Sequence, residues 1–196
     1  HKINYEDLEL SMIDKRSNES SHLKSDLQYY KSFMEWGMDG EANAFLEEVL
    51  LWLSENLPLN PNPKKLCWGD SRLGNVLFEN FQVKSLLDWE MATIGDPLCD
   101  LAWGLTTDDV SSHGLNIEKL PGSIANEEAI KFWEKNTGFS ADNFFYYRIL
   151  CLFKFSVIMI RVAKKLIHNE IMPLDSDFHV NNHVSNYLRQ EFNEKN

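Results

Sequence analysis

The sequence predicts an α+β fold that is mostly helical, with one small β-rich region near the middle of the chain. In the first and last parts of the chain, apolar residues recur at three- and four-residue spacing, as in amphipathic helices. Between Lys65 and Trp89 the pattern changes to short β-branched or aromatic runs separated by Gly, Asp and Asn. At 196 residues and 43% hydrophobic composition, the chain is long enough for one domain with a substantial core. We therefore expect one unit in which helices surround a small β region.

Two amphipathic helices are expected first, over residues 22–38 and 40–57. In the second of them, one stripe carries the apolar residues Ala42, Phe45, Leu46, Val49, Leu50 and Leu53. Pro58, Pro61 and Pro63 follow and cannot continue a helix, so they predict an extended connector.

Three short strands are expected next, over residues 65–68, 76–78 and 83–89. The second and third are separated by a turn at residues 79–82, which predicts an antiparallel hairpin. We expect this hairpin to bury one set of apolar side chains, namely Val76, Phe78, Leu86 and Leu87.

Helical patterns return after the hairpin. Asp96 is a good N-cap and Pro97 suits a first turn, so a helix is expected over residues 98–105, followed by a polar loop over 106–122. A further helix over 126–137 is predicted to end at Gly138. The segment 143–169 is apolar on most sides, which predicts a long central helix, and a last helix is expected over 177–193.

The charge balance limits the partners of the chain. The formal net charge is -11, which disfavours nucleic acid and anionic membranes because both need clustered Lys or Arg. The cysteines Cys67, Cys99 and Cys151 are odd in number and widely spaced, as in reduced cytoplasmic proteins without a disulfide framework. The chain starts at His1 rather than Met, so we expect the coding sequence to begin upstream.

Three polar residues stand among the apolar runs of the predicted strands. Asp70 and Asn75 are five positions apart in the loop between the first two strands, and Asp88 lies near the end of the third. A hairpin brings such loop ends together, so one amide and two carboxylates are expected to converge at an open face of the domain.

This set of side chains is what phosphoryl transfer requires. One carboxylate, Asp70, would accept the proton of an acceptor hydroxyl, while Asn75 and Asp88 offer the oxygen ligands that Mg²⁺ prefers. Arg72 is placed either to offset charge on the transferred phosphoryl group or to form an ion pair with a nearby carboxylate. The spacing D-x-R-x-x-N also matches the D-x-K-x-x-N of protein-kinase catalytic loops.

The segment from Leu66 to Leu105 closely resembles the aminoglycoside phosphotransferase and choline kinase superfamily, the phosphotransferase enzyme family. The family signature runs H-G-D-x-x-x-x-N, then a strand ending in D-W-E, then G-D-P-x-x-D-L-A. The corresponding residues here are Trp68-Gly69-Asp70 with Asn75, then Asp88-Trp89-Glu90, then Gly95-Asp96-Pro97 with Asp100-Leu101-Ala102. The Arg72-Leu73 pair and Asp88-Trp89-Glu90 are most similar to the branch of kinase-like domains fused to acyl-CoA dehydrogenases.

The resemblance implies the C-terminal lobe of the protein-kinase-like fold over residues 1–196, with the β hairpin region carrying the catalytic loop. It implies transfer of the γ-phosphoryl group of ATP, or of GTP, to a hydroxyl of a small molecule. Asp70 would be the base, Asn75 and Asp88 would hold the Mg²⁺ of the nucleotide, and Asp100 would brace the loop. Acceptors in the family include aminoglycosides, choline, homoserine, sugars and, in the dehydrogenase-linked branch, hydroxyacyl-CoA thioesters.

Two features depart from the family pattern. The usual His of the signature is Trp68, whose indole N–H can only donate a hydrogen bond, so the loop must be braced differently. No glycine-rich turn followed by a strand Lys and a helix Glu precedes Asp70, so the N-terminal nucleotide-binding lobe is expected to lie outside this chain. The alternative hypothesis is a non-catalytic, kinase-like binding or scaffolding module.

The tryptophans near the signature have a simpler interpretation. Trp68 and Trp89 are expected to be core aromatics rather than ligand platforms, and Trp103 is expected on the helix face with Leu101 and Leu105.

Overall fold

The computed structural model describes residues 1–10, 13 and 22–194. It confirms the α+β, mostly helical fold class. The elements are, in order, η1 (Tyr5–Asp7), α1 (His22–Met38), α2 (Ala44–Glu55), β1 (Lys65–Cys67), η3 (Leu73–Asn75), β2 (Val76–Glu79), β3 (Gln82–Leu86), β4 (Thr93–Gly95), α3 (Leu98–Ser112), η4 (His113–Leu115), α4 (Asn126–Thr137), α5 (Phe144–His168) and α6 (His183–Asn193).

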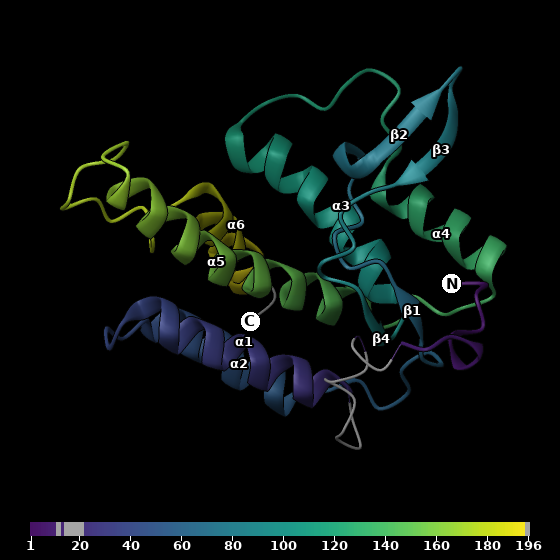
Figure 1. Cartoon of the computed structure of the whole chain (residues 1–196), viewed down its shortest axis with the longest axis horizontal. Coiled ribbons are helices and arrows are strands. Elements are labelled where there is room, and N and C mark those ends of the chain that lie inside the picture. Colours follow the sequence, from purple (N-terminus) through teal and green to yellow (C-terminus); the bar gives the residue numbers. More distant parts are fainter. Residues whose placement is uncertain (11–12, 14–21, 195–196) are drawn as a thin grey trace.

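Helix α5 forms the centre of the hydrophobic core. It packs against α1, α2, α3 and α6, and Figure 1 shows it running between the α1–α2 pair and α3. Its buried side chains point in several directions, as expected for a helix that is apolar on most sides; the fully buried ones include Tyr147, Ile149, Leu150, Leu152, Phe153 and Ile160. Within the residues that the structure describes, no helix is both long enough and apolar enough to cross a membrane.

The β structure consists of two separate antiparallel pairs, β1 with β4 and β2 with β3. Strand β4 was not predicted. In the first pair, Lys65 lies opposite Gly95 and Cys67 lies opposite Thr93. This pairing places the start of β1 beside the end of β4, which leads into α3, and Trp68, directly after β1, donates its backbone N–H to Asp100 of α3.

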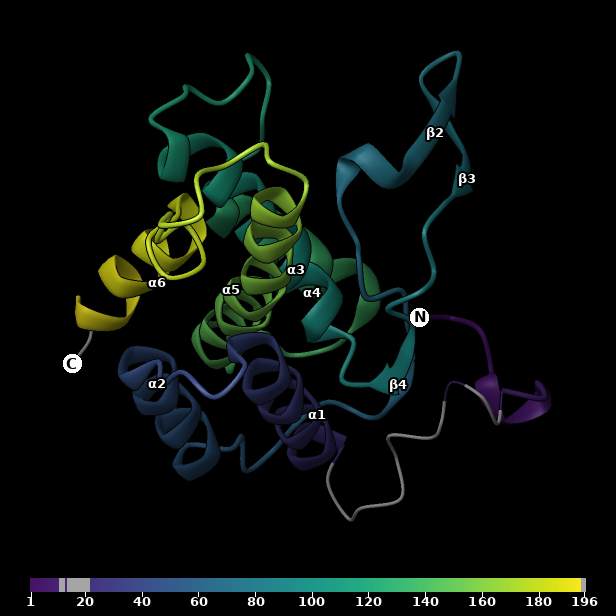
Figure 2. The ribbon, with the colours of Figure 1, turned by 60° about the vertical axis from the view of Figure 1, so that its left-hand side comes forward.

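The hairpin β2–β3 forms, but β3 ends at Leu86 rather than at Trp89, so Asp88 lies beyond the strand. The expected burial of the apolar side chains of the hairpin is wrong. Phe78, Leu86 and Leu87 are 51%, 38% and 42% exposed, and Val76 is only half-buried. Figure 2 shows the reason: the hairpin projects from the helical body, so neither of its faces is covered by another layer. An exposed apolar surface of this kind is typical of an interface.

Helix α3 extends to Ser112, beyond the predicted end at Leu105. The polar run after Leu105 resembles a loop, because Thr, Ser and Asp are weak helix formers. In the structure Thr107 donates its hydroxyl to the carbonyl of Trp103, and Ser112 donates to that of Asp108, so these side chains are satisfied within the helix.

Helix α6 begins at His183, six residues after the predicted start. Asn182 is its N-cap, and a capping box with Ser185 fixes the boundary.

Candidate functional site

The loop after β1 is held in place by Asp100 at the start of α3. The two carboxylate oxygens of Asp100 accept hydrogen bonds from the backbone N–H groups of Trp68 and Gly69, both at 2.8 Å. Gly69 has φ +90°, and a Cβ at this position would lie 2.2 Å from the backbone oxygen of Met91, so only glycine fits. The expected bracing by Asp100 is therefore present, and it acts through the backbone, independently of the side chain at position 68.

Helix α3 packs directly on this loop. A Cβ on Gly104 would lie 2.7 Å from the backbone oxygen of Ser71, and the Ser71 hydroxyl donates to the carbonyl of Asp100 at 2.6 Å. These contacts fix the position of the loop relative to the helix.

Two further side chains surround Asp100. His1 Nε2 lies 2.8 Å from Asp100 Oδ2, and the ligand atoms of His1, Cys67 and Asp100 all lie within 4.8 Å of one another. Burial raises the pKa of Asp100, whereas the N–H groups of Gly69 and Trp68 lower it; the raising effect is the larger. Burial also raises the pKa of the Cys67 thiol well above its usual value, which keeps it neutral. We interpret the three residues as support for the loop.

Asp100→Asn is expected to lower the free energy of unfolding by about 1–3 kcal/mol, because the amide NH₂ would face a backbone N–H and leave it unsatisfied. The measurement is a thermal melt, in which the variant should unfold several degrees below the parent protein. Asp108→Asn on the same helix is the control, since Asp108 is exposed and its carboxylate, within the described residues, forms a single ion pair, with Lys119. Equal melting temperatures for Asp100→Asn and the parent would contradict the bracing role.

The carboxylate of Asp70 is buried and accepts three side-chain hydrogen bonds. Oδ2 accepts from Asn75 Nδ2 at 2.7 Å and from Arg72 Nε at 3.0 Å. Oδ1 accepts from Trp103 Nε1 at 2.7 Å. Of the two alternatives for Arg72, the structure contains the ion pair with a nearby carboxylate, and the Arg72 side chain remains 51% exposed.

Asn75 connects Asp70 to the hairpin. Its amide nitrogen also donates to the backbone oxygen of Asp70 at 3.1 Å, and its backbone oxygen accepts from the N–H of Leu87 at 2.8 Å. Asp88 comes directly after Leu87, and its backbone lies in the left-handed region of conformational space, with φ +58°. A non-glycine residue in that region is uncommon and recurs at functional sites, and Asp tolerates it better than most residues.

Asp70 and Asp88 line the same cavity, which has a volume of about 600 Å³. The other polar lining residues are Arg72, Glu90, Thr107 and Ser111. Helices α1 and α5 contribute an aromatic and apolar wall, made by Tyr29, Tyr30, Phe33, Phe155 and Ile158. A second depression of similar size, between α1 and α2, contains none of the predicted site residues.

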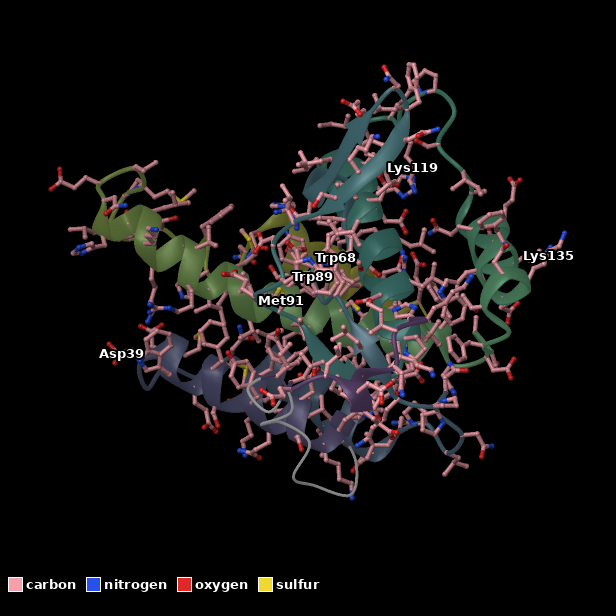
Figure 3. The ribbon with its side chains drawn as sticks, turned by 45° about the vertical axis from the view of Figure 1, so that its right-hand side comes forward. Asp39, Trp68, Trp89, Met91, Lys119 and Lys135 are labelled. Carbon is pink, nitrogen blue, oxygen red and sulfur yellow. The ribbon has the colours of Figure 1, made fainter. Side chains whose placement is uncertain are left out.

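The two tryptophans of the signature lie at the base of the hairpin. Trp68 and Trp89 have ring centroids 6.1 Å apart, and Figure 3 shows both beside Met91. Trp68 Nε1 donates to the backbone oxygen of Leu87, so the residue in the position of the usual His connects the loop to the segment directly after β3. Trp68 is half-buried, but Trp89 is 43% exposed, so the prediction of Trp89 as a core residue is wrong.

Trp103 is the site residue that the sequence did not reveal. It was expected only as a packed aromatic of α3, and it is indeed buried. Its indole N–H, however, points to Asp70. A buried Trp needs an acceptor for its N–H, and that general rule was the available signal.

Comparison with known proteins identifies the family. The model of the Phosphotransferase enzyme family matches residues 1–128. Among curated proteins, acyl-CoA dehydrogenase family member 11 of Gallus gallus is 33% identical over 138 residues, covering 63% of this chain and 18% of that protein. Member 11 of Homo sapiens is 46% identical over 59 residues, covering 29% of this chain and 8% of that protein. Acyl-CoA dehydrogenase family member 10 of Mus musculus is 26% identical over 175 residues, covering 84% of this chain and 16% of that protein. The chain thus spans less than a fifth of each of these relatives.

A solved structure supports the fold. A proposed aminoglycoside phosphotransferase of Ralstonia eutropha superposes with a TM-score of 0.71 at 18% identity, covering 96% of this chain and 57% of that one. The kinase-like α+β architecture is therefore shared over nearly the whole chain. With the family model matching more than half of its length, the chain belongs to the phosphotransferase enzyme family, and its relatives include the acyl-CoA dehydrogenase family members 10 and 11.

Proposed function

We propose that the protein transfers the γ-phosphoryl group of ATP, or of GTP, to a hydroxyl group of a small molecule, with Asp70 as the catalytic base. The observation that carries this proposal is the Asp70 carboxylate, which is fixed by three donors at the wall of a cavity of about 600 Å³. Phosphoryl transfer depends on positioning and on charge neutralisation, and a rigidly held carboxylate provides the first of these for the acceptor.

The residues present fit a bound Mg²⁺. Asp88 would contribute a carboxylate from the cavity wall. Asn75 would contribute its amide oxygen Oδ1, because its amide nitrogen is already bonded to Asp70. Both are hard oxygen ligands of the kind that Mg²⁺ prefers. When bound, the ion would neutralise charge on the nucleotide phosphates.

Arg72 has two roles in this proposal. It holds Asp70 through Nε, and its exposed guanidinium is free to turn toward a phosphoryl group in the same cavity. The acceptor would lie against the aromatic wall, so we propose a small alcohol whose carbon skeleton contacts Tyr29 and Phe33.

We propose that the protein binds neither nucleic acid nor anionic membranes, because its formal net charge is -11. We propose a cytoplasmic location, because the three cysteines are odd in number and widely spaced.

We also propose that the chain forms the C-terminal lobe of a two-lobed enzyme. The exposed hairpin and the short helix η3 before it support this, because their uncovered apolar side chains are those expected at a lobe interface; they include Leu73 (73% exposed), Phe78 (51%), Phe81 (103%) and Val83 (59%). A nucleotide-binding lobe packed there would help to position and cover the nucleotide phosphates.

The test of the proposed function is acceptor-dependent release of ADP or GDP by the full-length protein in the presence of Mg²⁺. The acceptor panel should contain an aminoglycoside, choline, homoserine, a sugar and a hydroxyacyl-CoA thioester. We expect one class of alcohol to stimulate release and to carry the phosphoryl group in the product. Failure of the whole panel, together with undetectable binding of Mg-ATP and Mg-GTP, would favour the non-catalytic binding module instead.

The 196-residue chain alone is the matched control for the two-lobe proposal. In a calorimetric titration it should bind Mg-ATP much more weakly than the full-length protein. The chain offers Mg²⁺ one carboxylate and one amide, so the ion also needs ligands from the nucleotide phosphates, and the other lobe would position those phosphates. Tight, Mg-dependent binding by the isolated chain would show that the nucleotide site is complete within it.

A further inference from the structure

We propose that Trp103 is a positioning residue for Asp70, and that its indole N–H makes Oδ1 the carboxylate oxygen that receives the proton of the acceptor. This inference rests on the proposed function, since it specifies how the base of that reaction is held.

The two carboxylate oxygens of Asp70 differ in the number of hydrogen bonds that they accept. An ionised carboxylate accepts hydrogen bonds at about four lone-pair sites, two on each oxygen. Oδ2 has two donors, Asn75 and Arg72, so its sites are used. Within the described residues, Oδ1 accepts one side-chain hydrogen bond, from Trp103, and therefore keeps one site for the acceptor hydroxyl.

The donor to Oδ1, the indole of Trp103, is held rigidly by its neighbours. Trp103 is 4% exposed, and its ring packs against Phe155 with centroids 5.9 Å apart. The ammonium of Lys154 lies 5.9 Å from the Trp103 ring centroid and 4.9 Å from that of Tyr30, and it forms a buried ion pair with Asp26 at 3.1 Å. A cation near an aromatic ring attracts the ring face, so the indole is held from α1 and α5 as well as by its own helix.

The proposed reaction then takes place at Oδ1 of Asp70. The O–H bond of the acceptor breaks and its proton moves to Oδ1 of Asp70. The hydroxyl oxygen forms a bond to the γ-phosphorus, and the bond from that phosphorus to the leaving nucleoside diphosphate breaks. The N–H of Trp103 on the same oxygen fixes the direction of the remaining lone pair, which is an orientation effect on kcat rather than on nucleotide binding.

Trp103→Phe in the full-length protein tests this proposal, because phenylalanine retains an aromatic ring and lacks the N–H. With basal hydrolysis of Mg-ATP as the probe, we expect kcat to fall about ten- to hundredfold, the effect of losing a hydrogen bond to a charged group, with KM for Mg-ATP unchanged. Trp133→Phe is the matched control. Trp133 lies on α4, the helix that carries Lys135 at the edge of the molecule away from Trp68 and Trp89 (Figure 3), and it packs against Phe139. Unchanged kcat in Trp103→Phe would overturn the proposal.

A second measurement does not depend on activity. Selective ¹⁵N labelling of the indole nitrogens gives one N–H signal per tryptophan, and the signal that is missing in Trp103→Phe belongs to Trp103. In Asp70→Ala this signal should move upfield, because the carboxylate acceptor is gone, whereas it should stay in place in Asp88→Ala. A Trp103 signal that does not respond to Asp70→Ala would overturn the proposal. Absence of any phosphotransfer by the parent protein would instead refute the proposed function, and the NMR result would still decide the contact.

Discussion

Asp70→Ala in the full-length protein is expected to lower kcat for phosphoryl transfer by roughly 10²–10⁴-fold, the range for loss of a general base. The variant removes the group that would accept the hydroxyl proton and leaves Arg72, Asn75 and Trp103 without their shared acceptor. The measurement is product formation at saturating Mg-ATP and acceptor. Because Asp70 does not hold the cation in this proposal, the affinity for Mg-nucleotide should change much less than kcat.

Asp88→Ala is the informative contrast to that variant. It removes a proposed ligand of Mg²⁺ from the cavity wall, so both kcat and the affinity for Mg-ATP should fall. Raising the Mg²⁺ concentration should recover part of the activity of Asp88→Ala and none of that of Asp70→Ala. If the two variants respond identically to Mg²⁺, the separate roles assigned to the two carboxylates are wrong.

The helices were the most predictable part of this fold. The bounds of α1 and α4 agree with the prediction to the residue, because a strong 3.6-residue pattern and clear end signals coincide there. Gly138, for example, ends α4 with φ +74°. The segment of α3 beyond Leu105 could not be predicted, because Thr, Ser and Asp are weak helix formers and the burial of Thr106, Asp109 and Val110 depends on tertiary packing.

The β region was harder to predict, for two physical reasons. Strand β4 has only three residues and exists through its pairing with β1, so it carries no periodic signal of its own. The apolar residues of β2 and β3 have the composition of core residues, yet most of them are exposed. Apolar composition alone does not determine whether another element of the chain packs on a strand.

The sequence predicts four residues of the candidate site, but it predicts neither their geometry nor the fifth residue, Trp103. The D-x-R-x-x-N spacing and the following D-W-E identify Asp70, Arg72, Asn75 and Asp88, and the structure places Asp70, Arg72 and Asp88 on one cavity, with Asn75 bound to Asp70. Trp103 enters the site from α3, 33 positions after Asp70. That contact depends on the packing of α3 against the loop, at Gly104, which is a tertiary feature.

The largest expected effect on stability comes from a buried charge network on the other side of α3. Arg148 of α5 donates from Nη1 to Asp109 at 2.6 Å and from Nε to Glu191 at 2.6 Å, and Nη2 donates to the hydroxyl of Tyr187 at 2.8 Å. Arg148 and Asp109 are 8% and 1% exposed, so the network joins α3, α5 and α6 inside the core. Although burial opposes the charge, the partners Glu191 and Asp109 raise the pKa of Arg148 above its usual value.

Arg148→Met is expected to lower the free energy of unfolding by about 3 kcal/mol, because the half-buried Glu191 would lose its cation and the buried Asp109 would keep Lys119 as its cation partner but lose Arg148. The fall in Tm should be roughly 10 °C for a domain of this size. Lys84→Met is the matched control: its partner Glu79 is on the exposed hairpin, and such surface pairs contribute about 0–1 kcal/mol.

The pH dependence separates loss of this charge network from loss of packing. Burial acts to raise the pKa of Asp109, but the hydrogen bonds from Lys119 and Arg148 outweigh it and hold that pKa below its usual value. A depressed carboxyl pKa contributes stability that is present above the pKa of the unfolded state, about 4, and is lost as the pH falls through the folded value. Urea unfolding should therefore show the largest difference between the parent protein and Arg148→Met near pH 7, and a smaller one below about pH 4. A difference that stays constant across this pH range would mean that Arg148 stabilises the core through its methylenes rather than through its charge.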